Sequence, residues 1–164
     1  MEDQSQADKP GKAFLAATII NAPMAKICTQ IQDFAQYPAF MPNTAKTSVS
    51  AGLDKTSLVD ITLSLPLGKI KKYRLKMTPN VTPQQCRLEW KQVPWAGLKQ
   101  DETIADTSGY WLLTTNATNP NKTVVSYFVF TDPGPVPLGL GWIVDSMSRD
   151  SIPKMLAALR NRVR

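Results

Sequence analysis

Acidic side chains are the first candidates for chemistry, because the chain contains no histidine. Without histidine, a Ser or Cys nucleophile has no imidazole base and a zinc ion has no imidazole ligand. Any acid–base step would use carboxylates, Lys, Tyr or Cys. The carboxylates considered for this role are Asp60, Glu89, Asp101, Glu102, Asp106, Asp132 and Asp145. None of them forms a pair at a recognisable spacing, so the sequence favours a protein that is not an enzyme, with no catalytic residue, metal or cofactor.

Two cysteines, Cys28 and Cys86, are the other reactive groups. Their spacing matches no metal-binding motif. Because free cysteines are among the residues most often found inside proteins, we expect both to be buried free thiols. The sequence leaves open whether they pair.

The elements that position these groups follow from patterning. Strand-like alternation begins at residues 13–20, a short amphipathic helix follows over 24–34, and alternation then dominates residues 44–132. The last strand, residues 123–132, is apolar at nearly every position and is expected to be buried on both faces. A long amphipathic helix follows, over residues 142–164. This order predicts an α+β fold in which the helix covers the apolar face of an antiparallel sheet.

The length of 164 residues predicts one domain, and no apolar run approaches the ~18 residues of a membrane-spanning helix. Residues 1–12 are polar and lack the apolar stretch of a signal peptide, so we expect them to form a disordered arm. The predicted location is the cytoplasm. The alternative is the periplasm or secretion, if a signal peptide preceded these residues.

A net charge of +6 favours acidic partners. The basic side chains of two neighbouring strands form a strip on the outer face of the predicted sheet: Lys69, Lys71, Lys72, Arg74, Lys76, Arg87 and Lys91. This strip either keeps the sheet soluble or makes transient contact with an anionic membrane. Nucleic acid is not expected, since the aromatic residues of these strands face the other way. The oligomeric state stays open.

Four stretches carry a resemblance to a known family: NAP…IQDFAQYPAFMP, GYWLLTTN, YFVFTDPGPVP and SIPKMLAALRNRV. Together they resemble the START-like superfamily, in particular its bacterial polyketide cyclase/dehydrase and lipid-transport branch. The resemblance covers residues 13–164 and departs from a common form of the DPG-P element at Pro135, where glycine is frequent. It implies a helix-grip fold, in which a curved antiparallel sheet of about seven strands wraps around a long C-terminal helix, with two short helices after the first strand.

Members of this superfamily mostly bind hydrophobic ligands between sheet and helix, and a minority catalyse reactions on them. The resemblance therefore implies a carrier of an isoprenoid quinone, a sterol or hopanoid, a fatty acid or a polyketide. The alternatives are a cyclase or dehydratase using Tyr73 or Tyr110 with a buried carboxylate, and an interaction module. Entry is expected through two gates, the loops at 37–41 and 93–99.

The candidate ligand-binding residues are the large apolar side chains expected to face the cavity or its mouth. They are Phe34, Tyr37, Phe40, Met41, Leu63, Leu65, Tyr73, Leu75, Met77, Trp90, Trp95, Trp111, Leu113, Trp142 and Met147. The competing interpretation is that they pack a solid core. Tyr and Trp favour a pocket, since their polar ends require partners that a dry core lacks.

Overall fold

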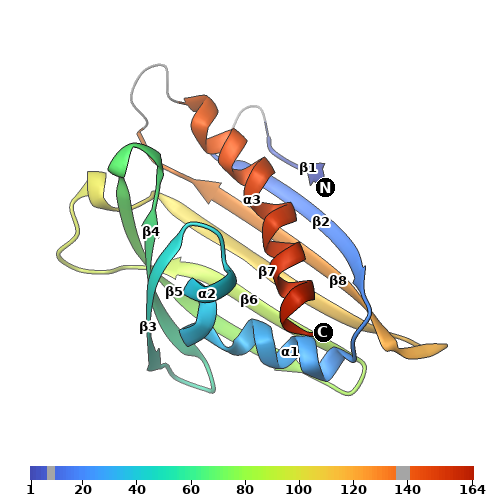
Figure 1. The fold of residues 1–164 in the computed structure, drawn as a ribbon. Helices are drawn as coiled ribbons and strands as arrows, with labels where there is room; N and C mark the ends of the chain where they lie inside the picture. Colours follow the sequence, from blue (N-terminus) through green and yellow to red (C-terminus); the bar gives the residue numbers. More distant parts are fainter. Residues whose placement is uncertain (7–9, 136–140) are drawn as a thin grey trace.

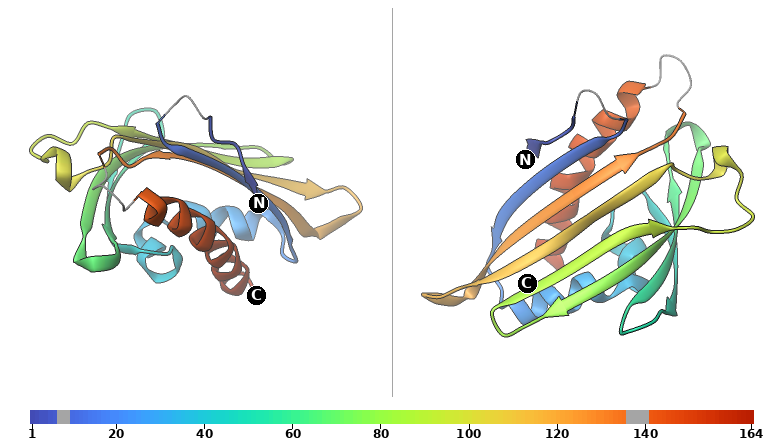
Figure 2. Two further views of the ribbon diagram at one scale, coloured as in Figure 1. Left: turned by 90° about the horizontal axis from the view of Figure 1, so that it is seen from above. Right: turned by 180° about the vertical axis from the view of Figure 1, so that it is seen from behind.

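The computed structural model describes residues 1–6, 10–135 and 141–164, and gives the backbone alone for 141–148. Eight antiparallel strands form one curved sheet in the order β1-β2-β8-β7-β6-β5-β4-β3. Their bounds are β1 Glu2–Asp3, β2 Lys12–Ile20, β3 Thr44–Ala51, β4 Ser57–Ser64, β5 Ile70–Val81, β6 Gln85–Val93, β7 Asp106–Asn116 and β8 Asn119–Asp132. The helix α3, Gly141–Arg162, crosses the concave face of this sheet (Figures 1 and 2). The structure thus confirms the predicted α+β helix-grip architecture.

Two short helices follow β2, as predicted. They are α1, Met24–Gln32, and α2, Tyr37–Phe40, separated by the 3₁₀ turn η1, Phe34–Gln36. Helix α1 begins after Pro23, whose restricted φ suits a helix start, and no side chain caps it. Its apolar face is buried, and Ile27 and Ile31 are fully so.

The alternating strands place their apolar side chains on the concave face. In β5 and β6 the buried residues are Leu75, Met77, Cys86, Leu88 and Trp90. The intervening charged residues lie on the convex face, because successive side chains of a strand point to opposite sides. Strand alternation therefore separates the buried apolar side chains from the solvent-facing charged ones, as the sequence predicted.

Strand β8 corrects one expectation. Val125 and Tyr127 are buried on the concave face, but Val124 on the convex face is 37% exposed. The strand is therefore covered on one face only. Its nearly continuous apolar sequence suggested burial on both faces, yet in the described part of the chain the long helix α3 lies on the concave side alone (Figure 2).

The first strand is a further difference from prediction. Glu2 and Asp3 pair with Leu15 and Phe14 of β2, so this part of the expected disordered arm is ordered and adds an eighth strand. Asp3 also forms an ion pair with Arg149 of α3, with Nη2 and Oδ2 2.7 Å apart. Contacts with two elements hold the segment at the edge of the sheet.

The C-terminal half of α3 is anchored firmly. Leu159 is fully buried and Val163, just beyond the helix, is 3% exposed. The Arg160 Nη2 group donates a hydrogen bond to Thr18 Oγ1 at 2.9 Å, and Arg162 Nε donates to Gln30 Oε1 at 3.0 Å. These basic residues therefore fasten the end of the helix to β2 and α1, in addition to the favourable interaction with its dipole.

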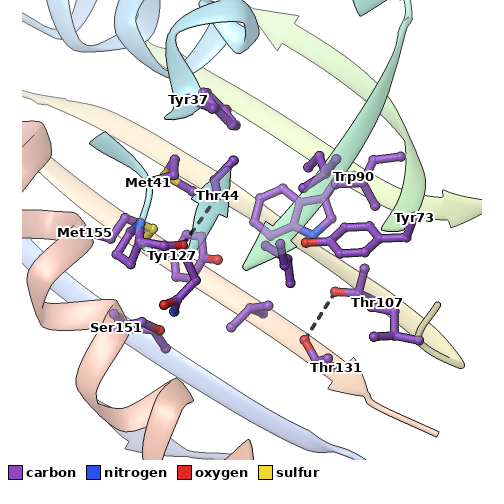
Figure 3. A pocket seen from close by; sticks show the side chains of 18 of the residues that line it. Tyr37, Met41, Thr44, Tyr73, Trp90, Thr107, Tyr127, Thr131, Ser151 and Met155 are labelled. Atoms are coloured by element: carbon purple, nitrogen blue, oxygen red, sulfur yellow. Dashed lines mark hydrogen bonds between the residues drawn. The ribbon is translucent and has the colours of Figure 1, made fainter. Parts of the chain in front are cut away.

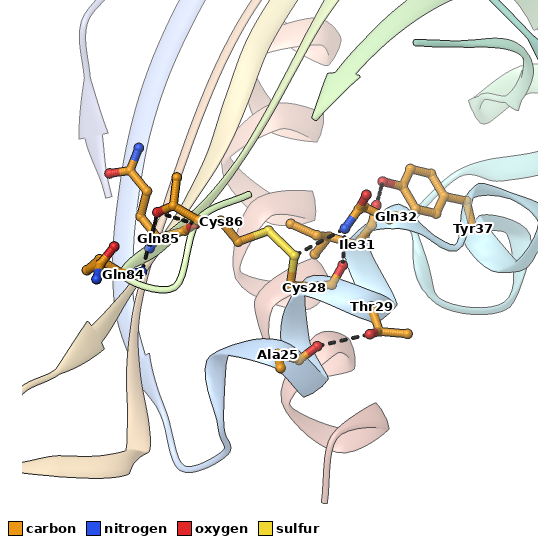
Figure 4. The surroundings of a disulfide bond; sticks show 10 residues. Ala25, Cys28, Thr29, Ile31, Gln32, Tyr37, Gln84, Gln85 and Cys86 are labelled. Atoms are coloured by element: carbon orange, nitrogen blue, oxygen red, sulfur yellow. Dashed lines mark hydrogen bonds between the residues drawn. A yellow bond between two sulfur atoms is a disulfide. The ribbon is translucent and has the colours of Figure 1, made fainter. Parts of the chain in front are cut away.

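The cysteines correct another expectation. Cys28 and Cys86 are buried but not free: they form a disulfide between α1 and β6, with Cα atoms 6.1 Å apart (Figure 4). A buried cysteine can be either a free thiol or part of a disulfide, so burial did not distinguish the two. Only the fold brings together two residues separated by 58 positions.

No helix in the described residues is long and apolar enough to cross a membrane. The same residues hold no cluster of His, Cys, Asp or Glu able to bind a metal ion.

Candidate ligand-binding cavity

A cavity of about 250 Å³ lies between the concave face of the sheet and the middle of α3. Strands β4 to β8 supply most of its wall, α2 and the following loop close one side, and Ser151, Ile152 and Met155 of α3 close another (Figure 3). Small-molecule sites typically measure ~300–1,000 Å³. A ligand with a large body would therefore extend through the mouth or move α3 away from the sheet.

Three aromatic side chains form the floor of the cavity. Tyr127 of β8 lies between Trp111, with ring centroids 4.6 Å apart, and Trp90, at 5.5 Å. Gly109 of β7 pairs with Trp90 across the strands, and a Cβ atom on Gly109 would stand 2.5 Å from the indole Cζ2 atom. The glycine thus leaves the space that the Trp90 ring occupies.

Hydroxyl groups gather at one side of this apolar space (Figure 3). Thr107 Oγ1 donates its single proton to the carbonyl oxygen of Phe130 at 2.8 Å. In the 3.3 Å contact between the Thr107 and Thr131 hydroxyls, Thr131 must therefore be the donor. With both protons used, this threonine pair can accept a hydrogen bond from a ligand but cannot donate one.

Tyrosine hydroxyls supply the missing donors. Tyr73 and Tyr127 line the cavity, and neither hydroxyl has a hydrogen-bond partner among the described residues. Burial raises the pKa of both side chains far above the ordinary tyrosine value, with the neighbouring Tyr73 adding to the shift of Tyr127. Both hydroxyls therefore stay protonated and can donate to a carbonyl or accept from a hydroxyl.

Tyr37 lines the cavity and also has a structural role. Its hydroxyl donates to the carbonyl oxygen of Ile31 in α1 (Figure 4), and its ring contacts Phe34 and Phe40 edge to face. Burial is the main cause that raises its pKa. The predicted gate at 37–41 is thus mostly the helix α2, held to α1 by this hydrogen bond.

The structure places most of the predicted site residues together. Those that line the cavity are Tyr37, Met41, Leu63, Leu65, Tyr73, Leu75, Met77, Trp90 and Trp111. Phe34, Phe40 and Leu113 are not in its wall and pack in the core instead. The side chains of Trp142 and Met147 lie outside the described residues. Whether the lining residues bind a ligand stays a prediction.

Trp95, predicted at the mouth, borders a second pocket of about 390 Å³ beneath the β6–β7 loop. Its ring lies 5.3 Å from the guanidinium of Arg74. Tyr73 borders both pockets, so the two spaces adjoin at this side chain. Gln92 also lines the second pocket; its Nε2 donates to Ile104 O, while its Oε1 is a buried acceptor without a partner in the described structure.

Several lining residues escaped prediction. They are Pro42, Asn43, Thr44, Ile61, Ile104, Thr107, Tyr127, Val129, Thr131, Pro133, Ser151 and Ile152. Ile61 could have been predicted, because alternation in β4 places it on the same face of the strand as Leu63. The continuous apolar run of β8 concealed the facing of Tyr127 and Val129, since it carries no period.

The basic strip is partly neutralised. Arg74 forms a two-point ion pair with Asp60, with Nε and Oδ1 2.7 Å apart, and Arg87 pairs with Glu89 at 2.8 Å. The Arg87 guanidinium also lies 4.2 Å from the centroid of the Tyr110 ring. An aromatic residue therefore does lie beside these charges, contrary to the expectation that all aromatic residues face the other way. That the protein does not bind nucleic acid stays a prediction.

No protein-family model and no curated protein matches the sequence. Solved structures match closely in shape. A STAR-related lipid transfer protein from Xanthomonas axonopodis superposes with a TM-score of 0.82 at 18% identity, over 99% of this chain and 91% of that one. Human StAR-related lipid transfer protein 5 gives 0.81 at 12% identity, over 98% and 79%. The Zhui aromatase/cyclase from Streptomyces sp. R1128 gives 0.67 at 14% identity, over 93% of each chain.

These similarities show that the chain has the START-like helix-grip fold. The same fold serves lipid transfer proteins and aromatase/cyclases, so function must be argued from the site.

Proposed function

We propose that this protein binds and carries a hydrophobic ligand that bears an uncharged hydroxyl or carbonyl group. The observation that carries the proposal is the wall of the cavity. Most of its described residues are apolar or aromatic, its polar groups are the amide of Asn43 and the hydroxyls of threonine, serine and tyrosine residues, and none of its described side chains is charged. Transfer of apolar surface from water into such a space is favourable by about 25 cal/mol per Å².

The uncharged wall narrows the ligand classes. A buried carboxylate without a cation is strongly unfavourable, which argues against an ionised fatty acid held head-first in the cavity. A sterol-like alcohol could donate to the threonine pair, while a quinone or polyketide carbonyl could accept from Tyr73 or Tyr127. These neutral amphiphiles therefore suit the site best.

Binding can be tested on lipid-free protein with two probes, dehydroergosterol for an alcohol head and decylubiquinone for a carbonyl head. Both are read through the fluorescence of the lining Trp90 and Trp111. Thr131→Val should weaken dehydroergosterol binding about fivefold by removing a hydrogen bond, and Tyr73→Phe should do the same for decylubiquinone. Thr62→Val on the convex face is the matched control for the threonine variant.

A cavity-filling pair separates binding inside the fold from binding on its surface. Val129 lines the cavity, whereas Val124 of the same strand is exposed on the convex face. Val129→Trp should abolish binding of both probes, and Val124→Trp should leave it unchanged. Equal binding by both variants would contradict the proposal.

A cyclase or dehydratase is the second candidate, because the Tyr73 hydroxyl lies in the cavity free of partners among the described residues. Its raised pKa makes it a poor base at neutral pH, and no described lining residue is a carboxylate; the Asp145 side chain lies outside the described part. Turnover of a polyketide that is lost in Tyr73→Phe, with binding retained, would favour this candidate.

We also propose that the protein works in an oxidising compartment, which is the periplasmic or secreted alternative. The buried Cys28–Cys86 disulfide supports this location, since disulfides are rare in the reducing cytosol. Maleimide labelling in intact cells, followed by mass spectrometry, tests it: two free thiols on the protein in its cell would contradict the proposal.

A further inference from the structure

Two large apolar side chains are exposed to solvent where β4 is joined to β5, Leu67 on the turn and Ile70 at the first position of β5. Leu67 is 76% exposed and Ile70 is 56% exposed. The turn is compact, with a 3₁₀ segment η2 at Pro66–Gly68 and a hydrogen bond from Leu65 N to Lys69 O at 2.8 Å. Single exposed apolar residues are common on protein surfaces, so exposure alone does not indicate that this pair binds a partner.

The backbone conformation of Leu67 is a second indication that this turn binds a partner. Its φ of 65° and ψ of 24° place it in the left-handed region, which glycine or asparagine occupies at lower cost. A leucine here gains little burial in return, because most of its side chain is in water. Folding stability alone therefore does not account for leucine at this position.

The position of the turn in the fold is a third indication. Leu65, at its start, lines the cavity, as do Pro42 and Asn43 of the adjacent loop and Pro133 after β8. The turn lies at the same end of the molecule as the beginning of α3 (Figure 1). The turn that carries Leu67 therefore begins at the wall of the cavity.

The charged residues of the turn and of the start of β5 are basic. Lys69 and Lys72 are exposed, and Lys71 Nζ donates to the carbonyl oxygen of Asp101 at 2.5 Å. The acidic Asp101 and Glu102 are on η3, Gln100–Glu102, next to Lys71. Lys69 and Lys72 are therefore the residues that give the turn and the start of β5 their positive character.

We propose that the β4–β5 turn docks the cavity mouth onto an anionic lipid bilayer. Leu67 and Ile70 enter the boundary between headgroups and acyl chains, while Lys69 and Lys72 bind lipid phosphates. Apolar side chains flanked by lysines match the two layers of such a surface, apolar below and anionic above. The inference rests on the proposed function, because a ligand carried in the cavity must pass between the mouth and a membrane.

Vesicle co-sedimentation tests the apolar contact with a matched pair of variants. Leu67→Asn removes the apolar tip and suits the left-handed backbone. Leu53→Asn is the control, since Leu53 is 84% exposed on the β3–β4 turn, at the other end of strand β4. On vesicles of phosphatidylcholine and phosphatidylglycerol in equal parts, Leu67→Asn should bind about tenfold more weakly than wild type, and Leu53→Asn should match wild type.

A second pair tests the charges. Lys69→Gln with Lys72→Gln should weaken binding to the mixed vesicles about 25-fold, from roughly fivefold for each lysine near an anionic surface. The control is Lys76→Gln with Lys91→Gln, two cross-strand neighbours on the convex face. Wild-type binding to pure phosphatidylcholine should be weak, and added salt should weaken binding to the mixed vesicles.

Three results would overturn the docking proposal. They are the absence of wild-type binding to the mixed vesicles, wild-type affinity in Leu67→Asn, and an equal loss in the Lys76/Lys91 control, which would assign docking to the sheet face. The first result would leave the turn to a protein partner. Decylubiquinone binding without vesicles separates the two proposals: a protein that binds the probe but not vesicles keeps its proposed function, and one that docks through Leu67 without binding any probe keeps only the docking.

Discussion

Cys28 of α1 and Cys86 of β6 are covalently joined, although 58 positions separate them in sequence. The bond connects the helix that supports α2 to a strand of the cavity wall. In the chain-entropy description, closing a loop of this length removes enough freedom from the unfolded chain to stabilise the fold by about 4 kcal/mol.

Reduction of the disulfide is therefore expected to lower the free energy of unfolding by up to about 4 kcal/mol. Urea unfolding with and without dithiothreitol measures the loss. The Cys28→Ala, Cys86→Ala double variant is the control, because the reductant should not change its midpoint. A wild-type protein indifferent to reductant would contradict the expectation.

Gly109→Ala is expected to destabilise the protein by about 2 kcal/mol, because the new Cβ would stand 2.5 Å from the Trp90 ring and against the backbone of Phe128. The displaced indole should also change the tryptophan fluorescence. Ser108→Ala, at the neighbouring convex position, should change neither quantity by a comparable amount. Thermal unfolding followed by fluorescence checks both.

Alkaline pH is expected to unfold the protein through its buried tyrosines. Burial raises the pKa of Tyr37 and Tyr127 above the ordinary value of 10.0, so above that pH the unfolded chain binds fewer protons than the folded one. Stability is therefore fully present below about pH 10 and falls above it, by up to about 1.4 kcal/mol per pH unit for each tyrosine. Urea unfolding across this range, with Tyr127→Phe showing a shallower slope, measures the effect.

Truncation of the α3 anchor is expected to be costly. Leu159 is fully buried, so Leu159→Ala should lower the free energy of unfolding by about 2–5 kcal/mol. Leu156→Ala, at a half-buried position on the same helix, should cost clearly less. Similar midpoints for the two variants in urea would show that the end of α3 is not anchored as described.

Relief of the strained turn is expected to stabilise the fold. Leu67→Gly places at a φ of 65° the one residue without a Cβ penalty, and little burial is lost. The free energy of unfolding should rise by about 1 kcal/mol. Leu53→Gly, in the other turn, is the comparison. A marked destabilisation by Leu67→Gly would mean that this leucine supports the fold.

Prediction from sequence succeeded where a residue's environment follows from its immediate neighbours. Alternation in β5 and β6 revealed that Leu75 and Trp90 face inward. It failed where partners come from distant segments. Trp95 resembled the other aromatic candidates, but the path of the β6–β7 loop places it over Arg74, and Leu113 shares the facing of Trp111 yet packs beyond the cavity wall.

The sequence by itself determined the α+β class, the order of the elements from β2 onward and the separation of an apolar from a charged sheet face, because these depend on periodicities within single segments. Only the tertiary structure decided the pairing of Cys28 with Cys86, the single covered face of β8 and the contact between the hydroxyls of Thr107 and Thr131. The physical reason is that sheet curvature and the crossing of α3 set which distant side chains meet, and neither is encoded in local spacing.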